Sequence, residues 1–471
     1  MNGIILIAGI VGVLWGLFFA MRGSLLVGCL IYLLLACCCG PNLYSFEAAG
    51  MTLSLDRLFL IGLVFAYLVQ LKLGRTEPKP LTLVDVALLA MVGLFAASTF
   101  THDWRGSGPN DVPILQHLIN GYLIPAVVYW IARQSKLDQR SMTTVLVAML
   151  LFGIYLAATA ILEATGQWSL VFPRYIADPD VGLHFGRARG PMVHSVSLGL
   201  YLATCLVGIW LLRERLSPRW QVIALAAVPL LMAGLFLTKT RSVWLGAATG
   251  IVVVLALTLK GRLRWGVLGS IVAAGVLLVM LNFDGILGIK REGTVQDTHR
   301  SNSMRSSFAY VSWLMFQDKP INGFGFGQFA REKLPYLSDR TTNLHLESIR
   351  NWEHHNTFLS VLTETGLVGF LLLMMVLFGW ANVGWRLHRD QSAPPWVQRH
   401  GKLLLAMLGI AFWQMLGHEI TFTSLDMALI FCLAGIAVGL KSSLAIEKTA
   451  ASLITQKTTE FPKFEQWRSA N

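Results

Sequence analysis

Apolar runs of roughly 16–22 residues recur along nearly the whole of this 471-residue chain. A helix needs about 20 apolar residues to cross the hydrocarbon core of a bilayer. Within that core only helices and closed barrels can satisfy their own backbone hydrogen bonds. Charged residues make up only 14% of the chain, against about 25% in soluble domains. The sequence therefore predicts an all-α polytopic membrane protein.

We expect about thirteen transmembrane helices, with twelve or fourteen as the alternatives because the second and third runs are short. The expected spans cover residues 3–21, 25–40, 58–71, 81–99, 113–131, 142–162, 191–212, 220–238, 242–259, 265–281, 367–385, 401–417 and 425–440. No Lys or Arg precedes the first run, so we expect it to be a retained span and not a cleaved signal peptide.

Short basic connections alternate with longer connections along the chain. The basic ones lie at Arg22 and at residues 72–79, 133–140, 213–219, 260–264 and 386–399. Because Lys and Arg collect on the cytoplasmic side of membrane proteins, these connections are predicted to be cytoplasmic. The N-terminus and the longer connections are then external.

This alternation predicts four regions. They are an N-terminal bundle of about ten spans (1–282), a large external loop with short helices between the tenth and eleventh spans (283–366), a C-terminal group of spans (367–442) and a mobile cytoplasmic tail (443–471). Within the loop, residues 302–317 are predicted to form a helix that Pro320 ends, followed by a glycine-rich turn at 322–327.

Several arginines stand on the external side, where the positive-inside rule disfavours them. Arg187 and Arg189 precede the seventh span, Arg241 lies in the short connection before the ninth, and Arg305 lies in the large loop. Guanidinium is planar, permanently charged and bidentate, so it suits phosphate oxygens. The four arginines are therefore candidates for binding a diphosphate. The alternative is that each arginine only extends to the lipid headgroups or pairs with a nearby acid.

The stretch EHHNTFLSVLTETGLVG, residues 353–369, begins polar and ends apolar. Asn356 is a good residue to begin a helix because its side chain accepts a free N–H of the first turn. His354 and His355 therefore lie where the external loop meets a span, and an imidazole there can remove a proton from a hydroxyl. Glu353 and Glu364 are candidate supporting residues. The alternative for the histidines is a hydrogen-bonding role at the membrane interface.

The sequence predicts neither a metal site nor a cofactor. All six cysteines lie within apolar runs, where they behave as small hydrophobic residues. Asp178-Pro179-Asp180 has no third acid near it and is interpreted as a turn. The net charge of +12 is assigned to membrane topology, and no nucleic-acid partner is predicted.

Three blocks of sequence resemble the O-antigen ligase and polymerase superfamily of bacterial membrane glycan enzymes. They are GRARGPMVHSVSLG, FLTKTRSVWLG, and the pair RSSFAYVSWLMFQDKPINGFGFGQF and HHNTFLSVLTETGLVGFLL. The first block departs from the family in one respect, since Ser195 follows His194 where the family often has a proline.

The resemblance implies a helical fold similar to lipid-dependent membrane glycosyltransferases, in a bacterial inner membrane with the active face external, or periplasmic. It also implies a metal-independent enzyme that passes a glycan from an undecaprenyl-diphosphate carrier to an acceptor hydroxyl during cell-surface polysaccharide biosynthesis. The acceptor is a glycan repeat for a polymerase, and lipid A core or another acceptor, which can itself be lipid-linked, for a ligase. The resemblance assigns catalysis to His355 and diphosphate contacts to Arg187 or Arg189, Arg241 and Arg305.

Two other classes stay open. A transporter or flippase of lipid-linked glycan is the first alternative, although such proteins usually show inverted repeats and broken helices that this sequence lacks. A non-catalytic assembly or sensor subunit is the second. Membrane lipids and other polysaccharide-assembly proteins are the expected further partners.

Overall fold

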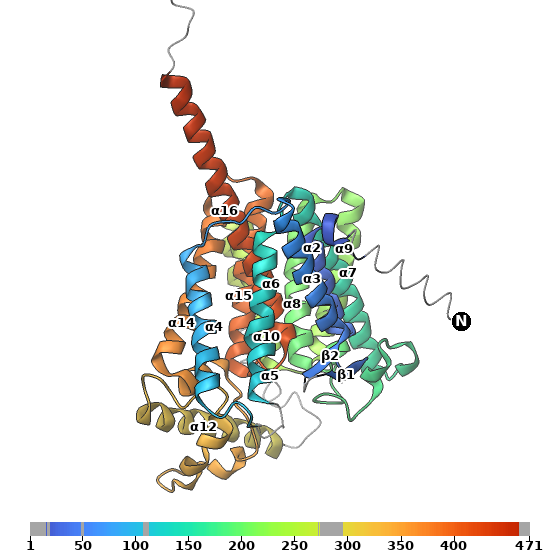
Figure 1. The fold of residues 1–471 in the computed structure, drawn as a ribbon. Coiled ribbons are helices and arrows are strands. Elements are labelled where there is room, and N and C mark those ends of the chain that lie inside the picture. Colours follow the sequence, from blue (N-terminus) through green and yellow to red (C-terminus); the bar gives the residue numbers. More distant parts are fainter. Residues whose placement is uncertain are drawn as a thin grey trace, which may run out of the picture.

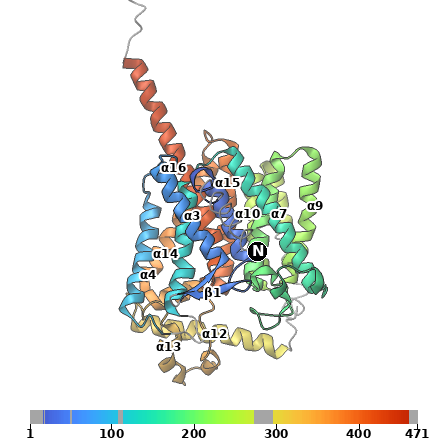
Figure 2. The same ribbon diagram turned by 45° about the vertical axis from the view of Figure 1, so that its right-hand side comes forward.

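In a computed structural model of the chain, the described residues are 19–48, 51–106, 113–271 and 295–460, together with Gly16 and Ala273. Long helices stand side by side in a bundle, and a layer made of α12 (Val295–Asp318) and several short helices lies across one end of it (Figures 1 and 2). Long apolar helices pack this way in a membrane because each helix satisfies its own backbone. The expected class of fold, a helical polytopic membrane protein, is confirmed.

The N-terminal half of the described chain supplies most of the bundle. Its elements are α2 (Leu25–Cys38), β1 (Ser45–Ala48), β2 (Met51–Ser54), α3 (Leu55–Lys72), α4 (Leu83–Thr101), α5 (Ile114–Leu118), the π-helix η1 (Ile119–Leu123), α6 (Ile124–Gln134), α7 (Gln139–Ala164), α8 (Ser195–Leu212), α9 (Pro218–Leu237) and α10 (Arg241–Thr258). Short 3₁₀ turns lie between α7 and α8 (η2, Trp168–Leu170; η3, Arg174–Ala177; η4, Gly190–Met192) and after α8 (η5, Arg213–Arg215).

The C-terminal half contains the crosswise layer and three long helices. Its elements are α12 (Val295–Asp318), α13 (Phe329–Glu332), the 3₁₀ turns η6 (Leu334–Ser338) and η7 (Leu346–Ile349), α14 (Thr357–Arg389), α15 (Pro395–Gly417) and α16 (Ser424–Glu460). We call residues 295–356 the lid. The lid has its own small apolar core, which includes Phe308, Met315 and Ile349.

Eight helices in the described part of the chain are long and apolar enough to span a membrane: those at Leu83–Thr101, Ile114–Gln134, Gln139–Ala164, Ser195–Arg215, Pro218–Leu237, Arg241–Thr258, Thr357–Arg389 and Ser424–Thr449. The expected spans at 58–71 and 401–417 also form helices, α3 and α15, but charged residues near their ends lower their hydropathy. The expected spans 3–21 and 265–281 lie mainly outside the described residues. The number thirteen therefore stays a prediction.

The structure differs from the expected elements in several places. Strands β1 and β2, expected only as part of an external connection, pair antiparallel, with Ser45 opposite Ser54 and Ala48 opposite Met51. The span expected at 367–385 continues a helix that begins at Thr357, with non-helical geometry only at Gly366. Helix α12 begins earlier than the expected 302 but ends at Asp318, as predicted. Helix α16 continues to Glu460, past the expected end of the span at 440.

The basic connections lie together at one end of the bundle. Arg75 donates to the carbonyl of Met21, the Lys79 ammonium donates to the carbonyl of Arg133, and Arg399 pairs with Glu214. The lid and the longer connections meet at the other end, where the Phe326 N–H donates to Ser98 Oγ at 3.0 Å. Among the described connections, the short basic ones therefore lie at one end of the bundle and the longer ones at the other, as the charge pattern predicts.

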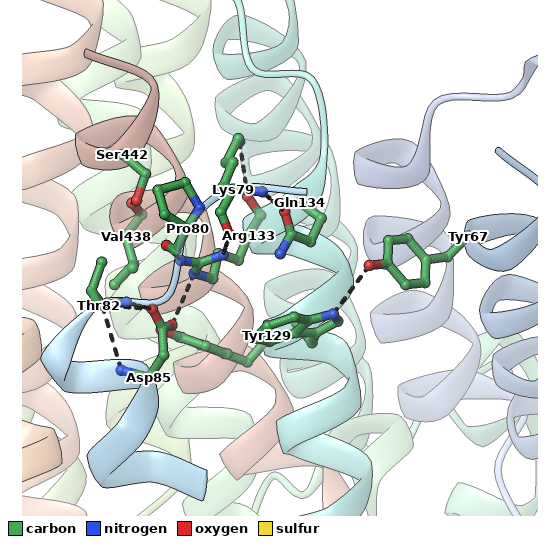
Figure 3. Close-up of polar contacts among 11 residues, drawn as sticks. Tyr67, Lys79, Pro80, Thr82, Asp85, Tyr129, Arg133, Gln134, Val438 and Ser442 are labelled. Carbon is green, nitrogen blue, oxygen red and sulfur yellow. Dashed lines mark hydrogen bonds and ion pairs between the residues drawn. The ribbon is translucent and has the colours of Figure 1, made fainter. Parts of the chain in front are cut away.

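A fully buried ion pair joins α4 and α6 near the basic end (Figure 3). Asp85 in α4 lies 2.8 Å from Arg133 in α6, and neither side chain is exposed. The same carboxylate accepts hydrogen bonds from Tyr129 and Thr82, each at 2.6 Å. Gly435 and Gly439 let α16 approach this part of α6, since a Cβ at either position would lie 2.4 Å from a carbonyl of α6.

We predict that Asp85→Asn destabilises the protein strongly. The substitution leaves the Arg133 guanidinium buried without its counter-charge, and breaking a buried pair in this way costs about 3–5 kcal/mol. Thermal unfolding of the purified protein in detergent measures the effect. Glu347→Gln, which breaks an exposed pair with Arg350, should change the melting temperature little. Equal shifts for the two variants would contradict a special role for the buried pair.

The assignment of the two ends to the two sides of the membrane is tested by reporter fusions. A reporter that is active only outside the cytoplasm should be active when fused after Thr298, in the lid, and inactive when fused after Arg262, at the basic end. The same activity at both positions would contradict the predicted topology.

Candidate functional site

Helix α14 begins where the lid meets the bundle, and three hydrogen bonds fix its first turn. Asn356 Oδ1 accepts from the Leu359 N–H at 3.0 Å, as a helix N-cap does, and its amide nitrogen donates to the Leu416 carbonyl at 3.0 Å. The Thr357 hydroxyl donates to the His418 carbonyl at 3.1 Å. The helix start predicted at Asn356 is thus confirmed, and it is tied to the connection between α15 and α16.

The two adjacent histidines occupy different environments. His354 is buried, with Nε2 3.1 Å from Thr363 Oγ1, and its ring centroid lies 3.6 Å from that of Phe329. Burial, reinforced by Lys333 and His355, holds the pKa of His354 well below its ordinary value, so this ring is neutral. His355 is half-buried and stacks on Phe308 with centroids 5.2 Å apart. His355 is therefore the more accessible of the two.

The hydrogen bond of His355 determines its tautomer. Its Nδ1 lies 3.1 Å from the backbone carbonyl of Glu353. A carbonyl can only accept, so Nδ1 carries the ring proton and Nε2 carries the lone pair. A general base needs a lone pair of this kind on a positioned nitrogen.

The glycine-rich turn of the lid packs on α14 around Glu364. Glu364 is buried, its carboxylate accepts from the Gly327 N–H at 2.8 Å, and its carbonyl accepts from the Gly325 N–H at 2.8 Å. Gly325 has φ of +109°, and a Cβ there would lie 2.6 Å from the His102 ring. Glu364 therefore braces the lid against the bundle.

A small acidic group lies beside the histidines. Glu353 and Glu364 line one pocket together with His354, His117 and Ser360. Burial and then the charge of Glu419 raise the pKa of Glu353 to about 7, while Lys333 opposes this shift. The Lys333 ammonium is itself buried and donates to the Trp352 carbonyl. Its burial lowers its pKa to about 8, against the attraction of Glu353.

Arg189 holds the connection between α7 and α8 together. Its side chain is buried, and its guanidinium donates to the carbonyls of Val181 (2.6 Å), Ile176 (2.9 Å) and Asp178 (3.2 Å). Its backbone N–H donates to Glu163 Oε2 at 2.9 Å. In this conformation the donors of Arg189 are used by its own loop, whereas Arg187, two residues earlier, is half-buried.

The connection between α9 and α10 links this loop to the end of α15. The Ala188 N–H donates to the Leu237 carbonyl at 3.1 Å, and the Lys239 ammonium donates to the Gly186 carbonyl at 3.3 Å. Arg241 is the first residue of α10 and its side chain is exposed. The next residue, Ser242, faces Gly417 closely enough that a Cβ on Gly417 would lie 3.1 Å from it.

His418, in the connection between α15 and α16, lies among three other histidines and an arginine. Burial is the main reason that its pKa is lowered well below the ordinary value, and four further groups act in the same direction: His194, Arg305, His355 and His184. One guanidinium nitrogen of Arg305 lies 3.4 Å from the Gly417 carbonyl. We call His184, His194, Arg305, His355 and His418 the histidine–arginine cluster.

The histidine–arginine cluster brings together segments that are distant in sequence. They are the α7–α8 connection, the lid helix α12, the residues before α14 and the α15–α16 connection. His194 is fixed within it, because its Nδ1 lies 2.9 Å from the Ser197 hydroxyl, which donates to Asp426 Oδ2 at 2.8 Å. Burial lowers the pKa of His194 to about 4, so this ring is neutral and Arg305 carries the permanent charge of the cluster. A guanidinium among imidazole rings is suited to an anionic ligand.

Sequence analysis missed His418 and Glu419. The available signal was a polar pair directly after an apolar run, the same pattern that singled out His354 and His355. Glu419 accepts hydrogen bonds from Thr357 (3.2 Å) and Thr421 (2.6 Å), so it also holds the first turn of α14. Within the described residues, no group of three or more His, Cys, Asp or Glu side chains is arranged to hold a metal ion.

Fold and site together define a multi-pass membrane protein with a polar site, rich in His and Arg, beneath a lid. Residues 226–374, about a third of the chain, match the model of a protein family described as O-Antigen ligase. The match confirms the resemblance to the O-antigen ligase and polymerase superfamily, and it covers Arg241, Arg305 and His355. The family supports a role as a membrane glycan ligase or polymerase. No curated protein matches the chain.

We predict that Arg241→Lys and Arg189→Lys fail in different ways. Arg241→Lys keeps the charge but loses the bidentate fork, so glycan transfer should fall strongly at a normal melting temperature. Arg189→Lys cannot reproduce three carbonyl contacts, so the melting temperature and the yield should fall. Glycan transfer and the melting temperature, measured for both variants, separate a role in binding the donor from a role in holding the loop. Near-normal transfer by Arg241→Lys would indicate that Arg241 is a structural anchor.

Proposed function

We propose that the protein transfers a glycan from an undecaprenyl-diphosphate carrier to an acceptor hydroxyl at the external membrane face. The observation that carries this proposal is the histidine–arginine cluster, which contains both the permanent charge of Arg305 and the imidazole of His355. A phosphate-bearing donor needs positive charge close to the reacting bond, and the acceptor needs a base within reach of the same bond. The O-antigen ligase family match is consistent with both substrates.

In this proposal the arginines stabilise the leaving group. The bond between the anomeric carbon and the phosphate oxygen breaks, and negative charge develops on the lipid diphosphate. Arg305, Arg241 and Arg187 would neutralise that charge as it forms, because guanidinium groups fixed in place are already oriented toward it. Arg189, whose donors hold the loop, would act indirectly by positioning Arg187. The leaving group then needs no metal.

His355 would act as the general base. Its Nε2 lone pair takes the proton of the acceptor hydroxyl while the acceptor oxygen bonds to the anomeric carbon. The contact between Nδ1 and the Glu353 carbonyl keeps the ring in the tautomer that this step requires. His354 is neutral and enclosed by Phe329 and Thr363, so we propose that it orients the loop. The same chemistry serves a polymerase and a ligase, which differ in the acceptor.

We predict that His355→Ala reduces turnover by about 10²–10⁴, the usual contribution of a positioned base, while the variant still binds the lipid-linked donor. His354→Ala should lose much less turnover. Turnover and donor binding are measured on purified protein with a lipid-linked glycan. Equal small losses in the two variants would reduce the pair to structural residues. Loss of donor binding in His355→Ala would make His355 a substrate contact. Transport of the lipid-linked donor across the membrane by the wild type, without glycan transfer, would favour the transporter alternative.

The pH profile provides a second test of the base. A base must be neutral to accept a proton, so turnover should fall as the pH drops and the imidazole becomes protonated. Glu353 also titrates in this range, since its pKa is raised to about 7. A fall of turnover at low pH therefore does not by itself identify the base. The fall should disappear in His355→Gln and persist in Glu353→Gln. The reverse result would assign the base role to Glu353.

A further inference from the structure

A pocket lined by two arginines lies at the opposite end of the bundle from the lid. It is formed by the first turns of α7 and α15 and by η5, the turn that follows α8. In Figure 1, the lid helix α12 is at the bottom and these elements meet at the top. The residues that line the pocket include Met142, Leu146, Arg215, Trp396, Arg399 and Leu403. The proposed glycan transfer makes no use of this pocket.

The charges around this pocket are not balanced within it. Arg399 pairs with Glu214 at 2.8 Å, and the Arg399 side chain is only 12% exposed. Arg215 lies within electrostatic range of the same two residues, and its Nε is buried without a hydrogen-bond acceptor among the described residues. Lys402 and Lys260 lie close to this group as well. A single carboxylate therefore faces several cations.

The remainder of the pocket wall is apolar. Met142, Leu146 and Leu403 line it beside the two arginines, and Trp396 stands at the beginning of α15, where the helix enters the bundle. Tryptophan is enriched at the level of the lipid headgroups. A free inorganic anion would gain nothing from the apolar wall. A phosphodiester with attached acyl chains would use both parts of the pocket.

We propose that Arg215 and Arg399 bind the phosphate of an anionic phospholipid headgroup from the leaflet at this end of the protein. The buried Arg215 Nε supplies a donor that lacks an acceptor, and the phosphodiester supplies both the acceptor and the missing negative charge. Basic pockets between membrane helices recognise anionic headgroups in this way. The bound lipid would join α7, α8 and α15 at the end remote from the reaction.

Native mass spectrometry of the full chain in zwitterionic detergent tests this proposal. Phosphatidylglycerol is titrated against phosphatidylcholine with the same acyl chains. The wild type should retain one phosphatidylglycerol about tenfold more tightly than phosphatidylcholine, and Arg215→Gln should lose about that factor, which corresponds to one charge-assisted hydrogen bond. Arg219→Gln removes an exposed charge at the same end but outside the pocket, and it should behave like the wild type.

Three results would overturn the proposal. They are wild-type affinity in Arg215→Gln, an equal loss in Arg219→Gln, and displacement of the lipid by inorganic phosphate at equal concentration, which would indicate a site for a free anion. If Arg215→Gln does not fold, Arg215→Lys replaces it. That variant keeps the charge and should retain a preference for phosphatidylglycerol with weaker binding, and an unchanged affinity would again count against the proposal.

Discussion

The hydrogen bonds that tie the first turn of α14 to the α15–α16 connection determine where the polar site lies. Asn356, Thr357 and Glu419 make these bonds, so His355 is held at a fixed place on the end of the bundle. The lid packs on the same helix about two turns further on, where the N–H groups of Gly325 and Gly327 donate to Glu364. The beginning of α14 therefore positions His355, the lid and the bundle relative to one another.

The two ends of the protein use charge differently. At the basic end, Arg133 is neutralised by Asp85 and is wholly buried, as an ionised group inside a membrane bundle must be. At the lid end, the histidine–arginine cluster gathers around His418, and Glu353, Glu364 and Glu419 lie together on its flank. Arg305 is the permanent charge of that cluster, and a guanidinium among imidazole rings is suited to an anionic ligand.

Much of the architecture could be predicted from local pattern. The expected spans at 142–162, 220–238 and 242–259 lie within two or three residues of the corresponding ends of α7, α9 and α10, because the length of an apolar run is fixed by bilayer thickness. The π-helical turn at Ile119–Leu123 could not be predicted. It depends on Gly121, which lets the Thr421 carbonyl approach so closely that a Cβ would lie 2.5 Å from it, and Thr421 is some 300 positions away in the sequence.

The sequence by itself determined the class of protein, the alternation of connections and the start of α14, since hydropathy, charge bias and N-cap chemistry act over a few residues. Only the tertiary structure distinguished the arginines from one another. Arg187 and Arg189 are nearly adjacent in sequence, yet the guanidinium of Arg189 is used by backbone carbonyls of its own loop. Tertiary structure also brought His418 and Glu419 to the site, because contacts between distant segments decide which side chains share a buried space.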